Sequence, residues 1–206
     1  MEAADDLQSV PKSFSKSSTF SIAITGQIEK VSFPSCDHVY CKYTCSYGAD
    51  WTVVAGNAEG ITQVGKKAVF PAPSCSNESA QDIVWNHPVE VTFSSCNPFG
   101  WPQLVFSVHG LSPYGSDVIR GYGAIHIPPI PGSHSLSVSL FAPESSSLLG
   151  RFRAWISGKK PEFVDAKVAA QGEGRGVLSV QSDGFLSLKV NVIARDLLKQ
   201  GYRYTA

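Results

Sequence analysis

Cysteine and histidine side chains gather near residue 40, where four of them fall within ten residues. They are Cys36, His38, Cys41 and Cys45. Thiolates and imidazoles are the ligands that Zn²⁺ prefers, so the cluster first suggests a zinc site. If residues 39–45 form a strand, however, Cys41 and Cys45 stand roughly 13 Å apart at ~3.3 Å per residue, too far to share one ion or to form a disulfide. We therefore expect no metal site, and reduced thiols that pack as small hydrophobic side chains.

Residues that could serve a hydrolase are present, but they do not form a recognisable motif. The segment 110–115, Gly-Leu-Ser-Pro-Tyr-Gly, lacks the glycine that a nucleophile elbow needs two residues after its serine. The five histidines are scattered along the chain, and none stands in a motif with an acid and a nucleophile. We expect no catalytic site. A hydrolase would need a pocket that gathers a histidine, an acid and a nucleophile from separate segments.

Two other groups of residues suggest binding. Aromatic side chains stand in turns rich in glycine, asparagine and proline, where they either cap one end of a core or anchor a partner. The candidates for contact with a partner protein are Tyr47, Trp51, Phe99 and Trp101. A local basic cluster could instead rest on anionic lipid, although cations in water beside a packed helix are the plainer interpretation. The candidate lipid-facing residues are Arg151, Arg153, Lys159 and Lys160.

The composition is that of a β-rich protein. Charged residues make up only 17% of the 206 residues, and 18 glycines and 13 prolines indicate many turns and few solvated helices. The 17 basic and 17 acidic side chains cancel, which argues against a nucleic-acid partner because phosphate binding needs a basic face. No apolar stretch approaches the ~20 residues of a membrane-spanning helix, and the acidic first residues do not resemble a secretory signal. We expect a cytoplasmic protein.

Alternating large apolar residues define the expected strands. This period of two occurs in six segments, at 20–24, 39–45, 89–93, 104–108, 136–140 and 186–192. With glycine and proline between them, such segments predict an all-β, antiparallel β-sandwich of about eight strands.

Other stretches depart from this period. Leu148, Leu149, Phe152, Trp155 and Ile156 recur at spacings of three and four, which predicts one short inserted amphipathic helix. A weaker helical pattern covers 195–200 and ends at Gly201. We expect a flexible tail at 1–18, one domain at 19–202 with a surface loop at 66–81, and a tail at 203–206.

An ordered series of motifs resembles the B-nine domain family. The matching segments run from Tyr40 to Tyr43, Tyr47 to Trp51, Trp85 to Phe93, Asn97 to Gln103, Arg120 to Gly123 and Gln171 to Arg175. The resemblance covers about residues 20–202. It implies a C-two-type antiparallel β-sandwich, and membership of the Meckel syndrome complex at the basal body and transition zone of the cilium.

The resemblance also implies partners and a role. The partners would be the two sister B-nine proteins and other Meckel complex or transition-zone membrane proteins, and the role would be cilium assembly and control of the entry of ciliary membrane proteins. Calcium-binding relatives of the sandwich use pairs of the form Asp-x-Asp, and none occurs here, so we expect no calcium and no other cofactor. We therefore expect a non-catalytic scaffold, with a calcium-independent peripheral lipid-binding module as the alternative.

Overall fold

The computed structural model describes residues 19–34, 36–67, 82–111, 115–143 and 180–203. These residues form nine strands and one short 3₁₀ helix, so the all-β expectation is confirmed with one strand more than predicted. The elements are β1 (Phe20–Ser32), β2 (Val39–Ser46), β3 (Trp51–Gly56), β4 (Glu59–Ile61), β5 (Asp82–Ser95), β6 (Gln103–Leu111), β7 (Asp117–His126), β8 (Gly132–Pro143), β9 (Val180–Arg195) and η3 (Leu198–Gln200).

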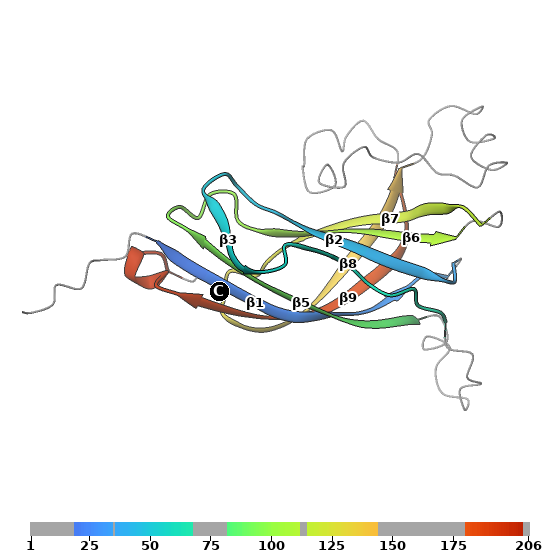
Figure 1. Ribbon diagram of the computed structural model, residues 1–206, viewed down its shortest axis with the longest axis horizontal. Coiled ribbons are helices and arrows are strands. Elements are labelled where there is room, and N and C mark those ends of the chain that lie inside the picture. Colours follow the sequence, from blue (N-terminus) through green and yellow to red (C-terminus); the bar gives the residue numbers. More distant parts are fainter. Residues whose placement is uncertain (1–18, 35, 68–81, 112–114, 144–179, 204–206) are drawn as a thin grey trace, which may run out of the picture.

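The strands pair in the order β3-β5-β1-β9-β8-β7-β6-β2-β4, and every pairing is antiparallel. Neighbouring strands pair extensively along the run β3-β5-β1-β9-β8 and along the run β7-β6-β2-β4. Between β7 and β8, however, the described residues pair only at Tyr122 and Phe141. The sheet therefore folds at this corner into a layer of five strands and a layer of four strands that face each other (Figure 1).

The core lies between the two layers and takes every second residue of the predicted strands. Ile24 on β1 and Val91 on β5 are paired across one layer, and both are fully buried. Phe106 on β6 and Cys41 on β2 are equally buried in the other layer. All six alternating segments direct their apolar residues into this core, as predicted.

The other three strands, β3, β4 and β7, show no clear alternation of apolar and polar residues in the sequence. On β7, glycines take positions that face the core, because a Cβ on Gly123 would lie 2.7 Å from Cγ1 of Val138 and one on Gly121 would lie 3.2 Å from Cβ of Leu140. β3 is interrupted by a register shift between Val53 and Ala55, and β4 has only three residues. Because of this close packing and irregularity, these strands lack the alternating apolar pattern by which a strand is predicted from sequence.

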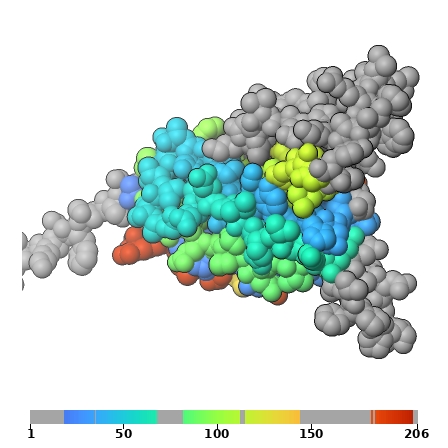
Figure 2. Space-filling view, turned by 45° about the vertical axis from the view of Figure 1, so that its right-hand side comes forward, coloured from blue at the N-terminus to red at the C-terminus, as the bar shows by residue number. Residues whose placement is uncertain are grey.

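The chain itself closes one side of the sandwich. β3 pairs with β5 in one layer and β4 pairs with β2 in the other, so the chain crosses between layers at residues 57–58. It then returns, because Gly65 exchanges backbone hydrogen bonds with Val39 and Lys67 forms a bridge with Ile83. In Figure 2 this segment, in cyan and teal, extends over the front of the molecule between β2 and β5.

Several predicted features fall outside the described residues. They include the amphipathic helix expected over 148–156, the tail at 1–18 and most of the loop at 66–81. The second helix is present in shorter form, because η3 covers three residues and ends at Gly201, whose φ is 89°. Over the described residues, we find no helix with the length and apolar character needed to cross a bilayer.

Candidate functional site

Two turns meet at one end of the sandwich and carry the aromatic candidates. The turn between β2 and β3 and the turn between β5 and β6 are joined where the Gly48 N–H donates to the Gly100 carbonyl at 2.9 Å. Gly100 has a φ of 72°, and a Cβ on it would lie 2.5 Å from Cα of Gly48. A side chain at residue 100 would therefore separate the two turns.

Polar contacts fix the second turn. The Phe99 N–H donates to Oδ1 of Asn97 at 3.0 Å, and the side-chain amide of Asn97 donates to Asp50 in the facing turn at 3.2 Å. Ser95 also bridges the turns, because its hydroxyl lies 2.9 Å from the Asp50 carbonyl. These contacts keep the backbone around Phe99 in one conformation.

Trp51 and Trp101 support the turns from beneath. Trp51 is 2% exposed, and its indole N–H donates to the Phe99 carbonyl at 2.9 Å. Its ring meets that of Trp101 edge to face at 5.3 Å, while the indole N–H of Trp101 donates to the Ile127 carbonyl at 2.8 Å. The structure thus gives these two candidates a supporting position instead of an outward one.

Phe99 and Tyr47 are the candidates that reach the surface. Phe99 is 81% exposed at the tip of its turn, and Tyr47 is 40% exposed with its ring 5.2 Å from that of Phe93. Two further exposed residues, Leu198 and Tyr202, were not predicted from the sequence. The ring centroid of Tyr202 lies 6.0 Å from that of Phe20. Both residues come from the η3 region, which lies beside the start of β1 (Figure 1), so this end of the sandwich has an apolar rim.

The second candidate surface cannot be placed. Arg151, Arg153, Lys159 and Lys160 all lie outside the described residues. Their contact with lipid therefore stays a prediction from the sequence.

The cysteines near residue 40 are buried as expected. Cys36, Cys41 and Cys45 are buried in the core, and Cys96 is exposed. Burial raises the pKa of the Cys45 thiol to about 12 and raises that of Cys41 as well. Within the part of the chain that the structure describes, no three histidine, cysteine or acidic side chains gather in an arrangement that could hold a metal ion.

One histidine does lie between a serine and an acid. Nε2 of His109 is 3.4 Å from the Ser107 hydroxyl, and its Nδ1 is 3.7 Å from Asp117. The arrangement is unsuited to hydrolysis, because Ser107 and His109 stand two residues apart on one strand and are only 7% and 9% exposed. Asp117 also accepts a hydrogen bond from the Tyr40 hydroxyl. Burial is the main cause that raises the pKa of Tyr40 to about 12, and the hydrogen bond to Asp117 raises it further.

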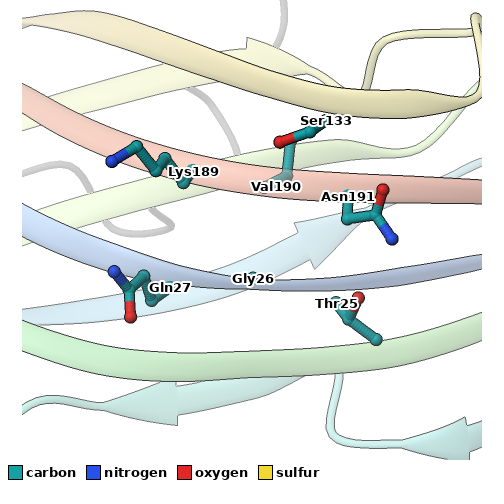
Figure 3. A pocket seen from close by; sticks show the side chains of 7 residues that line it. All are labelled: Thr25, Gly26, Gln27, Ser133, Lys189, Val190 and Asn191. Atoms are coloured by element: carbon teal, nitrogen blue, oxygen red, sulfur yellow. The ribbon is translucent and has the colours of Figure 1, made fainter.

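An open, shallow pocket lies on the outer face of the five-stranded layer. Figure 3 shows Thr25 and Gln27 on β1 and Lys189 and Asn191 on β9 around it, with Ser133 from β8 at its rim. It lies in the other layer from Ser107 and His109, so it does not combine with them into a catalytic site.

Comparison with known families identifies the fold and the lineage. The family described as "Ciliary basal body-associated, B9 protein" (B9-C2) matches residues 22–193, a range that begins near the start of β1, ends near the end of β9 and includes every strand between them. The chain belongs to this B9 family. The B-nine resemblance and its C-two-type all-β fold are thereby confirmed.

Individual B9 relatives agree with this assignment. The chain is 49% identical to B9 domain-containing protein 1 of Mus musculus over 185 residues, which are 90% of this chain and 87% of that protein. It is 27% identical to B9 domain-containing protein 2 of Homo sapiens over 87% of this chain and 97% of that protein. Among solved structures, C2 domain A of plant Extended Synaptotagmin 1 aligns with a TM-score of 0.42 and 13% identity over 83% of this chain and 92% of that one.

Proposed function

We propose that this B9 protein is a non-catalytic scaffold of the Meckel syndrome complex at the ciliary transition zone. In this role it binds the two sister B9 proteins and contributes to cilium assembly and to the control of membrane-protein entry. The observation that carries the proposal is the 49% identity to B9 domain-containing protein 1 over 90% of the chain, together with a family described as associated with the ciliary basal body. The matching family and the relatives named above are not described as enzymes.

Phe99 is the proposed anchor for a partner. Its side chain is 81% exposed, while its backbone is held by Trp51, Asn97 and the Gly48–Gly100 contact. An exposed phenylalanine on a rigid turn loses little conformational freedom when a partner covers it, and full burial of such a side chain contributes about 1.5–3 kcal/mol. Tyr47 extends the same apolar rim.

Co-expression with the two sister B9 proteins tests the proposal. Size-exclusion chromatography with light scattering should give a stable complex of defined mass. Phe99→Ala should weaken that complex at least about tenfold, as truncation of an interface anchor does. The matched control is Phe185→Ala, because Phe185 is 55% exposed on the outer face of β9.

Two results would contradict the proposal at different levels. A protein that forms no complex with either sister would remove the scaffold role. A complex that Phe99→Ala and Phe185→Ala affect equally would keep the scaffold role but would remove Phe99 as its anchor.

A further inference from the structure

Among the residues that the structure describes, the edge of β8 that faces away from β9 has no neighbouring strand along most of its length. β8 pairs with β9 from Gly132 to Pro143, whereas only Phe141 is paired with β7. Over the described ranges, the outward backbone N–H and C=O groups from Gly132 to Val138 therefore have no ladder partner on this side, whereas a Cβ on Gly123 of β7 would lie 3.4 Å from the Ser139 carbonyl oxygen.

The other sheet edges carry features that discourage strand addition, and this edge does not. β3 has a register shift at its middle, β4 has three residues, and β7 has a register shift with β6 and the charged residues Asp117 and Arg120. Between Gly132 and Leu140, by contrast, the sequence Gly-Ser-His-Ser-Leu-Ser-Val-Ser-Leu has no charge and no proline, and its register with β9 is unbroken. Natural proteins use charges, prolines and bulges to protect free edges.

Burial is also incomplete along this part of the strand. Leu136 faces the core but stays half-buried, although its neighbour Leu188 on β9 is 1% exposed. His134 is likewise half-buried beside Val190, which is 2% exposed. Ile130, whose carbonyl contacts His134 at 2.8 Å, is 37% exposed. A strand added to this edge would cover this apolar opening.

We propose that the free edge of β8 pairs antiparallel with β8 of a second copy of this chain. The sequence supports a second copy because Ser133 to Ser139 reads Ser-His-Ser-Leu-Ser-Val-Ser, which is nearly symmetric about Leu136. A two-fold axis at Leu136 brings each residue opposite a compatible one, as an isologous contact requires.

The pairing is specific in its details. Leu136 meets Leu136 of the second copy on the core side. Ser135 meets Ser137 of the second copy on the outer side, where all four odd-numbered serines of the segment are exposed. Cross-strand leucine and serine pairs both stabilise antiparallel strands, and no like charges oppose each other. This self-association uses a strand edge and not the Phe99 side chain, and it does not depend on the ciliary role.

The test uses charges of one sign at positions that face each other in the dimer. Size-exclusion chromatography with light scattering on the full chain, over a range of concentrations, should show a monomer–dimer equilibrium. The variant Ser135→Lys/Ser137→Lys should weaken dimerisation at least about tenfold, because each new lysine opposes another. The control Asn191→Lys/Ile193→Lys adds the same charges with the same spacing on exposed positions of β9 and should dimerise like the unsubstituted chain.

A rescue experiment separates pairing from unfolding. Ser135→Glu/Ser137→Glu should also be monomeric alone, but an equimolar mixture with the lysine variant should form heterodimers because opposite charges then meet. The proposal is overturned if the unsubstituted chain stays monomeric at high concentration, if the lysine pair at β8 acts no differently from the control, or if mixing restores no dimer.

Discussion

Two neighbouring aromatic residues at the end of the sandwich have opposite environments. Trp51 is 2% exposed and hydrogen-bonded to the Phe99 carbonyl, whereas the Phe99 ring is 81% exposed. Sequence alone placed both in one group, because aromatic residues in turns serve either a core or a partner. The difference depends on the contact between two turns that are about fifty residues apart in the chain, which no local pattern reports.

Trp51→Ala and Phe99→Ala should therefore differ in stability. Trp51→Ala should lower the free energy of unfolding by about 3–5 kcal/mol, since it leaves a cavity beneath the turns. Phe99→Ala should change that free energy by less than about 0.5 kcal/mol, because its ring is mostly in water. Urea unfolding measures both, and equal losses would contradict the supporting role of Trp51.

The buried thiols predict a loss of stability at high pH. The folded chain holds the Cys45 proton up to a pKa of about 12, and burial raises the pKa of Cys41 too, whereas an unfolded thiol titrates near ~8.5. Only the unfolded state then loses these protons above about pH 9. Each thiol should cost about 1.4 kcal/mol of stability per pH unit from there toward pH 12.

Urea unfolding between pH 7 and pH 10.5 checks this direction. The variant Cys41→Ala/Cys45→Ala should be less stable at pH 7 but should lose less stability as the pH rises. A pH dependence that is unchanged in this variant would show that other groups, such as Tyr40, cause the loss.

At the scale of elements, the packing of β7 on β8 depends on glycine. Gly123→Val would place a Cβ 2.7 Å from Val138 and 3.0 Å from Leu140, so the two layers would have to separate. We expect a loss of about 1–3 kcal/mol or more, as overpacking of a core produces. Ser139→Val, on the exposed side of β8, is the matched control and should have little effect on thermal unfolding. Equal effects would mean that the corner is less tightly packed than the glycine contacts indicate.

The strands that the sequence predicted and those that it missed differ for a physical reason. Ile22, Ile24 and Val91 alternate with small or polar residues because one side of their strands meets the core and the other meets water. β7 breaks this rule, since Gly121 and Gly123 face the core where β8 leaves no room for a side chain. The fold class was thus predictable from the chain, but the corner between the layers required the structure.

At the scale of the whole molecule, the position of a strand in the sheet predicts how strongly its amides are protected from hydrogen exchange. β1 lies between β5 and β9 and supplies Ile22, Ile24 and Ile28 to the core, whereas β8 has an edge that is free over the described residues. Hydrogen exchange should therefore be slowest in β1 and faster at the outward amides of residues 132–138, in a sample dilute enough to be monomeric. Slow exchange throughout β8 in that sample would show that its edge is covered.

The central place of β1 also bears on how the protein is made. β1 pairs along its length with β9, which begins about 150 residues later in the chain, so one flank of this strand has no partner until the ribosome has almost finished the domain. At ~5–20 residues per second, this delay is roughly 8 to 30 seconds. A polypeptide released before residue 180 would lack an interior strand of its larger layer and would expose the flank of β1 to chaperones or to other nascent chains.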